Sequence, residues 1–226
     1  MTCHRIVTAA LAGLALGLGA CTAGEEEPTS TATSPDAPVL QPGRPGEPNT
    51  SLSGTSAVAS PSASYNSADV DFLQDMIVHH AQAVVMGDIV KGTLTDPKVT
   101  AIASRISDEQ KPEMRGMART LTSWKEDVPP QAENPTFGMR NGHSSHGSMP
   151  GMATTQQLER LERATGADQD RLYLDLMIRH HQGALTMSTT LSRQGADERT
   201  GELGDDITVT QTKQIEQMKA MRTRLS

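Results

Sequence analysis

Two segments of the chain, residues 76–86 and 177–187, carry a pair of adjacent histidines between two methionines. They read MIVHHAQAVVM and MIRHHQGALTM, so the His and Met residues occupy the same positions in both. Imidazole nitrogens and thioether sulfurs bind transition metals, and thioethers favour soft ions such as copper(I). Copper(I) is therefore the expected ion and silver(I) its mimic, while zinc remains an alternative through the imidazoles alone. The predicted metal ligands are His79, His80, Met76, Met86, His180, His181, Met177 and Met187.

The spacing of these residues places them on the apolar face of a helix. At 100° per residue, Met76, His79, His80, Ala83 and Met86 fall in one sector, and the second segment repeats the arrangement. A buried imidazole is costly unless it has a hydrogen-bond partner or a metal ion. Hydrogen bonding would explain one such histidine. Four histidines in a repeated pattern with methionines favour a metal site.

The helices that carry these residues belong to an internal repeat with an offset of 101 residues. The repeat extends past the His pairs, since Gln110 and Met117 are matched by Gln211 and Met218. Capping residues and apolar periodicity predict helices that start near Ser67, Pro97, Thr154, Asp168 and Arg199. The predicted capping residues are Ser67, Asp96, Thr154 and Asp168, and the helix capped by Asp168 is expected to end at Gly195. Pro112 is expected to kink the second helix without ending it.

This pattern predicts an all-α fold, a four-helix bundle made of two duplicated helical hairpins. The bundle is expected over residues 67–226, with hairpin 1 at 67–124 and hairpin 2 at 154–226. The connecting segment at 125–153 is rich in Gly, Ser, Pro, His and Met and is predicted to be a loop. Further candidate metal ligands are Met114, Met117, Met218 and Met221 on the partner helices and His143, His146, Met149 and Met152 in the loop. Ordinary core packing is the alternative for each methionine.

The N-terminus predicts export and a lipid anchor. Residues 6–18 are apolar or small, a length that suits a secretory signal and is too short for a membrane span. The following Leu18-Gly19-Ala20-Cys21 resembles the lipobox of bacterial lipoproteins. We expect a signal peptide at 1–20, lipidation at Cys21 and a disordered tether at 21–66, which holds the domain on the outer face of the cytoplasmic membrane.

Other function classes are less well supported. A net charge of −7 without a basic run argues against nucleic acid as a partner. No Glu-x-x-His pair of the di-iron bundle proteins and no Gly-x-Ser-x-Gly elbow occurs, so we predict no catalytic residues and no enzyme. Two alternatives stay open: a metal-dependent redox enzyme, and an interaction module without metal whose histidines are satisfied by hydrogen bonds.

The repeated motif resembles domain-of-unknown-function family 305. The residues that carry this resemblance are the Met-Ile-x-His-His segments at 76–80 and 177–181, Gly166, Asp170 and the runs from Gln110 and Gln211, over about residues 67–226. Pro112 departs from the smooth helix of that pattern. The resemblance implies a ferritin-like bundle, an extracytoplasmic copper-binding protein for copper sequestration, tolerance or trafficking, and copper-transport or copper-resistance proteins as partners. It leaves the oligomeric state open.

Overall fold

The computed structural model describes residues 39–41, 48–52, 65–139 and 149–226. The predicted signal peptide at 1–20 and the residues Cys21, His143 and His146 lie outside the described residues. The chain divides into two compact units, residues 1–61 and 62–226.

The first unit contains a short antiparallel pair of strands, β1 (Val39–Gln41) and β2 (Thr50–Leu52), with Val39 opposite Leu52. Both strands lie within the predicted tether, whose composition indicates no regular structure. Two strands of three residues are marginal by themselves in water. They therefore add a local feature to the tether without giving it a core.

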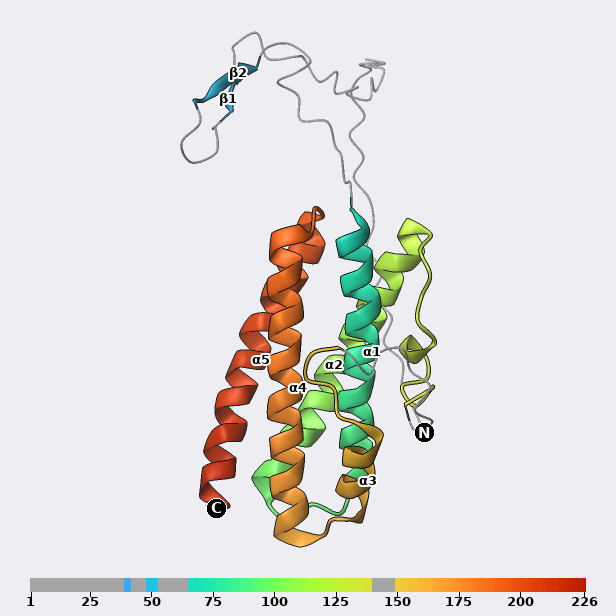
Figure 1. The fold of residues 1–226 in the computed structure, drawn as a ribbon, viewed down its shortest axis with the longest axis vertical. Coiled ribbons are helices and arrows are strands. Elements are labelled where there is room, and N and C mark those ends of the chain that lie inside the picture. Colours follow the sequence, from blue (N-terminus) through green and yellow to red (C-terminus); the bar gives the residue numbers. More distant parts are fainter. Residues whose placement is uncertain (1–38, 42–47, 53–64, 140–148) are drawn as a thin grey trace, which may run out of the picture. The chain divides into compact units, whose positions relative to one another are not determined.

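The second unit is the predicted helical bundle, which confirms the all-α fold (Figure 1). Two long helices form each hairpin, α1 pairs with α2 and α4 with α5, and the hairpins pack through α1 against α4 and α2 against α5. A 3₁₀ turn lies in the connection between the hairpins, and the short helix α3 precedes α4 at the start of the second hairpin. The bounds are α1 (Ser67–Ile89), α2 (Pro97–Trp124), η2 (Pro130–Ala132), α3 (Thr155–Arg163), α4 (Gly166–Gln194) and α5 (Glu198–Arg224).

The helix starts are mostly set by local capping. Asp96 caps α2 with Pro97 in the first helical position, and Thr154 forms a capping box with Gln157 at the start of α3, both as predicted. The N-cap of α1 is Asn66 rather than Ser67, because the Asn66 side chain accepts hydrogen bonds from the backbone N–H groups of residues 68 and 69.

The start of α4 also differs from the prediction. Thr165 is its N-cap residue, and Asp168 lies within the first turn. The Asp168 carboxylate pairs with Arg171 one turn later and therefore does not cap the helix. At the other end, Gly195 is the C-cap as predicted. Pro112 lies inside α2, which continues past it to Trp124.

Two buried aspartates hold the hairpins together in a reciprocal manner. Asp69 of α1 accepts hydrogen bonds of 3.0–3.2 Å from the backbone N–H groups of residues 196–197, just before α5. Asp170 of α4, its equivalent 101 residues later, accepts hydrogen bonds from the N–H groups of Thr95 at 2.9 Å and Asp96 at 3.0 Å, just before α2. Each hairpin thus supplies the carboxylate that orders the turn of the other.

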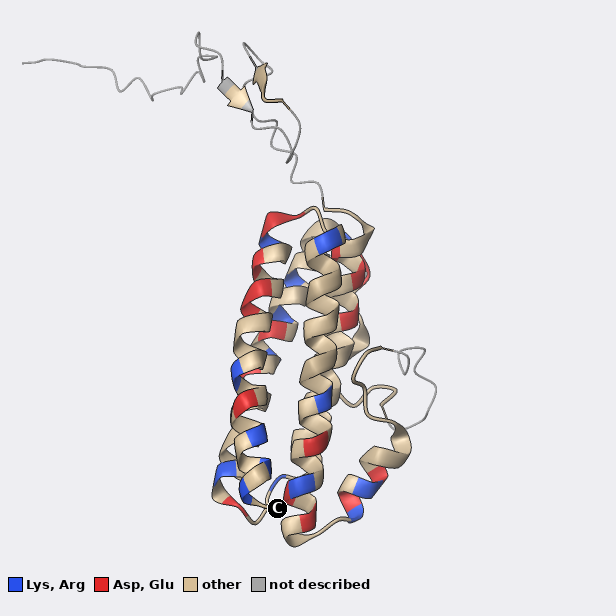
Figure 2. Ribbon diagram, turned by 60° about the vertical axis from the view of Figure 1, so that its left-hand side comes forward, with Lys and Arg blue, Asp and Glu red and all other residues tan. Residues whose placement is uncertain are grey.

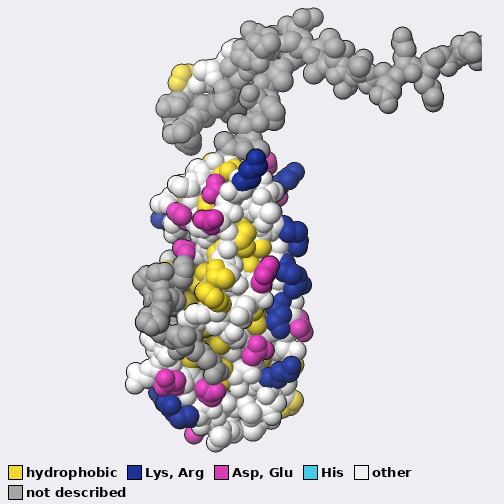
Figure 3. Space-filling view, turned by 90° about the vertical axis from the view of Figure 1, so that its right-hand side faces the viewer, with side chains coloured by type: hydrophobic (Ala, Val, Ile, Leu, Met, Phe, Trp, Pro, Cys, Tyr) yellow, Lys and Arg dark blue, Asp and Glu magenta, His cyan; other side chains and the backbone are white. Residues whose placement is uncertain are grey.

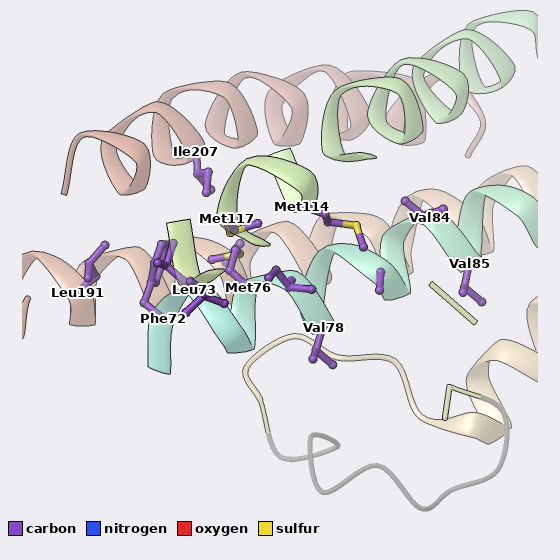
Figure 4. Packing of buried hydrophobic residues seen from close by; sticks show 14 of the residues in the cluster. Phe72, Leu73, Met76, Val78, Val84, Val85, Met114, Met117, Leu191 and Ile207 are labelled. Atoms are coloured by element: carbon purple, nitrogen blue, oxygen red, sulfur yellow. The ribbon is translucent and has the colours of Figure 1, made fainter. Parts of the chain in front are cut away.

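The core consists of aliphatic and thioether side chains with few aromatics, in two apolar clusters. Figure 4 shows part of one of them, with Met76 and Met117 near Phe72 and Leu73. Charged residues of both signs are distributed along the helices (Figure 2). Within the described part of the chain, none of the helices combines the length and apolar character that crossing a bilayer requires.

Candidate metal centre

The four helix histidines lie together where α1 and α4 pack against each other. His79, His80, His180 and His181 have no solvent-exposed surface, which confirms the burial that the helical periodicity predicts. The rings of His79 and His180, one from each hairpin, have centroids 3.8 Å apart, and those of His180 and His181 are 6.3 Å apart. None of the four histidines is visible on the molecular face drawn in Figure 3.

The inner pair, His79 and His180, is held by backbone carbonyls. The Nε2 atom of His79 lies 3.0 Å from the carbonyl oxygen of Pro150, and that of His180 lies 3.0 Å from the carbonyl oxygen of His79. Since a carbonyl oxygen only accepts hydrogen bonds, each Nε2 must carry the proton and donate it. The inner histidines are therefore fixed in the tautomer that leaves a lone pair on Nδ1.

The outer pair, His80 and His181, reaches the same tautomer through side chains of the second helices. His80 Nε2 donates to the Glu113 carboxylate of α2 at 2.7 Å. His181 Nε2 lies 2.6 Å from the Oε1 atom of Gln214 on α5. The amide nitrogen of Gln214 donates to Glu109, so its oxygen is the atom that accepts from His181.

All four Nδ1 atoms are buried without a hydrogen-bond partner, and in a neutral ring with the proton on Nε2 this atom is an acceptor. Burial also favours the neutral form of three of these imidazoles. Burial, with the neighbouring His80 as a further cause, lowers the pKa of His79 to about 3, and burial lowers the pKa of His181 to about 4. Burial and the neighbouring histidines lower the pKa of His180 well below its usual value. Neutral, oriented, unpaired Nδ1 atoms are what metal coordination requires.

The methionines divide into two groups that each draw on both hairpins. The Met76 cluster contains Met76, which precedes the His pair of α1, and the partly buried Met187, which follows the His pair of α4. Its other methionines are Met114, Met117, Met139 and the partly buried Met149. The Met177 cluster makes the opposite combination and contains Met86, Met177 and Met218 with the partly buried Met221. Of the predicted loop ligands that are described, Met149 joins the core while Met152 belongs to neither cluster.

The arrangement restricts the ligand set that a metal could use. Within residues 65–139 and 149–226, no three His, Cys, Asp or Glu side chains are grouped so that they could hold one ion. The methionine thioethers are the soft donors that an ion bound by one or two of these imidazoles could use in addition. Such mixed nitrogen and sulfur sites suit soft ions. The donors present fit copper(I) or silver(I) better than zinc, which gains little from thioethers.

A short strap, residues 149–153, lies against His79 and the backbone of α4. Its Pro150 carbonyl binds His79, and the side chain of Gln82 pairs with both backbone groups of Ala153, at 2.6 and 2.9 Å. The strap passes so close to α4 that a Cβ atom at Gly183 would overlap the Pro150 carbonyl. Glycine at this position therefore lets the end of the His/Met-rich loop lie against His79 and the backbone of α4.

A surface groove runs beside the strap. It has a volume of about 320 Å³ and lies between α1 and α4, with Phe72, Pro150 and Met187 among its lining residues. Met187 also packs against the Met76 cluster, so this residue borders both the groove and the apolar core.

Sequence reasoning missed the residues that orient the histidines. Glu113 and Gln214 lie on the second helices, 33 residues after the histidines that they contact. Their positions do obey the 101-residue offset, so the repeat contains a signal for them. Pro150 has no such signal, because it acts through its backbone carbonyl.

Comparisons with known proteins agree with this architecture. The model of the family described as "Domain of unknown function (DUF305)" matches residues 69–222. No curated protein sequence matches the chain. Among solved structures, a DUF305 protein from Streptomyces coelicolor, named as a candidate secreted protein, is 29% identical with a TM-score of 0.59, over 70% of this chain and 93% of that one.

Two further structures are of a protein named CopM. Its Cu(II)-bound form is 28% identical with a TM-score of 0.57, over 70% of this chain and 97% of CopM. Its Cu(I)-bound form is 25% identical with a TM-score of 0.54, over 69% of this chain and 96% of CopM. CopM has also been solved with silver bound. The DUF305 family model covers more than half of the residues of the chain described here, including both His pairs and nearly all of the four long helices. This chain therefore belongs to the DUF305 family.

Proposed function

We propose that this protein binds copper(I) outside the cytoplasm, through the helix histidines and the methionines around them, for copper sequestration, tolerance or trafficking. The observation that carries the proposal is the set of four buried Nδ1 atoms, each oriented by a hydrogen bond at Nε2 and each without a partner. Leaving four buried acceptors unpaired is costly unless a ligand satisfies them.

The relatives support the same ion class. CopM shares the fold and has been solved with Cu(I), Cu(II) and silver. In this chain, the methionines that precede and follow each His pair in the sequence pack in or against two apolar clusters and offer soft donors. The proposed role is binding rather than catalysis, and copper-transport or copper-resistance proteins are the proposed partners. If the role is binding, the copper-loaded protein should show no copper-dependent oxygen consumption. If the partners are copper-transport or copper-resistance proteins, the loaded protein should transfer copper to one of them.

Replacing His79, His80, His180 and His181 by alanine is expected to lower copper(I) affinity by more than the 10- to 100-fold that outer-shell changes typically cost. Affinity is measured anaerobically by competition with a chromogenic copper(I) chelator. Both cysteines are changed to serine in parent and variant, so that thiolates do not compete. Equal affinity in parent and variant would show that the buried histidines are not ligands.

A second variant keeps the test valid if the alanine variant does not fold. Met76→Leu with Met187→Leu approximately conserves side-chain volume, and such exchanges usually cost less than about 1.5 kcal/mol each. Copper(I) affinity should fall while zinc affinity stays unchanged, because thioethers contribute to soft ions only. Circular dichroism checks the helical content of each variant. Unchanged copper(I) affinity in this variant would exclude these two sulfurs as ligands.

We also propose that Cys21 anchors the protein to the membrane by a lipid. The lipobox-like Leu18-Gly19-Ala20-Cys21 motivates this proposal. A protein anchored in this way should partition into the detergent phase of a membrane extract, and Cys21→Ser should move it to the aqueous phase. Partition that does not change on this substitution would contradict the anchor without affecting the copper site.

A further inference from the structure

The two outer histidines are equivalent in the repeat, but their hydrogen-bond partners differ in charge. Glu113 and Gln214 are 101 residues apart and therefore occupy the same position in the repeat. Glu113 accepts a hydrogen bond from the Nε2–H of His80 at 2.7 Å, and Gln214 accepts one from the Nε2–H of His181 at 2.6 Å. His80 therefore donates to a carboxylate, whereas His181 donates to a neutral amide. The repeat preserves the geometry of the contact and changes its electrostatics.

A carboxylate behind an imidazole changes the ligand at its other nitrogen. A charge-assisted hydrogen bond withdraws the Nε2 proton from the ring and increases electron density at Nδ1. Carboxylate–histidine–metal arrangements of this kind raise ligand basicity and fix ring orientation. The carboxylate also places a negative charge one imidazole away from the ion, which favours a divalent cation over a monovalent one.

The second hairpin has a weaker version of this arrangement. Gln214 donates from its amide nitrogen to Glu109, so a carboxylate is present behind His181, but with a neutral amide between them. Glu109 and Glu113 are four residues apart on α2 and thus one helical turn apart. One helix therefore supplies a negative charge to both outer histidines, at two different distances.

We propose that Glu113 makes His80 the ligand that selects copper(II), while His181 with its amide partner serves copper(I). This inference rests on the proposed copper-binding function. Glu113 acts through His80 and is a positioning residue rather than a ligand. Its side chain is 30% exposed, whereas that of His80 is fully buried, so its charge acts on the ion through the ring.

The test is Glu113→Gln, which keeps an oxygen acceptor for His80 and removes the charge. Affinities for copper(II) and copper(I) are measured separately by chelator competition on the full chain with both cysteines changed to serine. Copper(II) affinity should fall by about 10- to 100-fold, the range for outer-shell substitutions. Copper(I) affinity should change much less. The copper hyperfine coupling in electron paramagnetic resonance spectra should also change, since it reports the donor strength of the imidazole.

Glu109→Gln is the matched control, because it removes the same charge from the same helix at the position shielded by Gln214. It should change copper(II) affinity less than Glu113→Gln does. In a His80→Ala background, Glu113→Gln should have no further effect on the affinity for either ion. The inference is wrong if Glu113→Gln affects both oxidation states equally, or if its effect persists without His80.

The converse exchange is Gln214→Glu combined with Glu109→Gln, which moves the carboxylate next to His181 and avoids two adjacent like charges. It should raise copper(II) affinity in the Glu113→Gln chain toward that of the parent, and no recovery would count against the inference. Failure of the proposed function looks different: the parent and the variant lacking all four histidines would bind copper(I) equally.

Discussion

Replacing Asp170 by alanine is expected to lower the free energy of unfolding by about 3 kcal/mol or more. The Asp170 carboxylate is fully buried and accepts hydrogen bonds from the backbone N–H groups of Thr95 and Asp96 and from the Thr95 hydroxyl. Its removal takes the shared acceptor away from three donors at once, and hydrogen bonds to a charged acceptor are among the stronger ones. Urea unfolding followed by circular dichroism measures the change.

Asp168→Ala is the control for this prediction. Asp168 lies two residues earlier on the same helix, its side chain is 81% exposed, and it forms an ion pair with Arg171. Exposed pairs contribute about 0–1 kcal/mol, so this variant should stay close to the parent. Asp69→Ala should behave like Asp170→Ala, because its carboxylate makes the equivalent contacts to residues 196–197. Equal stability of the Asp168 and Asp170 variants would contradict the assignment.

Metal-free protein is expected to lose stability as the pH falls from 6.5 toward about 4.5. Burial lowers the pKa of His79 to about 3, that of His181 to about 4 and that of His180 well below its usual value. Below pH 6.5 the unfolded chain binds protons at these rings and the folded chain does not. Above pH 6.5 the titration of these histidines does not reduce the free energy of unfolding. As the pH falls from 6.5 to the folded pKa of a histidine, the free energy of unfolding decreases by about 1.4 kcal/mol per pH unit for that histidine.

His181→Gln separates this effect from the titration of carboxylates. Glutamine keeps an N–H donor for Gln214 and has no titrating group. The free energy of unfolding is measured by urea unfolding at a series of pH values. It should fall less steeply with decreasing pH in this variant, and the difference in slope should be up to about 1.4 kcal/mol per pH unit, which corresponds to one proton. Identical pH profiles for parent and variant would mean that His181 is protonated equally in the folded and unfolded chain.

The elements of the bundle could be predicted from the sequence because they depend on local signals. Asp96 before Pro97, Thr154 before Gln157 and the apolar stripe around the His pairs are each readable within one turn or one helix. The choice of Asn66 over Ser67 as N-cap depends on Asp69, whose carboxylate accepts from the Asn66 backbone N–H and completes the capping box. Two adjacent capping residues made this boundary ambiguous in the sequence.

The grouping of the methionines could not be predicted from one helix. Met76 and Met86 are ten residues apart, which is about 15 Å along a helix, so they cannot both bind one ion. The antiparallel packing of α1 on α4 brings Met76 into one cluster with Met187, and Met86 into the other with Met177. That register is a tertiary property. The partners Glu113 and Gln214 depend on it as well, because they come from the second helices.

The reciprocal contacts of Asp69 and Asp170 give the two hairpins the relation of subunits in an isologous dimer, in which each partner uses the same patch on the other. In a dimer of identical chains, every substitution appears at both equivalent places. Here the segment 125–153 joins the two halves covalently, so a residue can change in one half alone. The pair of Glu113 and Gln214 is such a change. A fused pseudo-dimer can therefore hold two chemically different sites in one fold, a freedom that a symmetric assembly does not have.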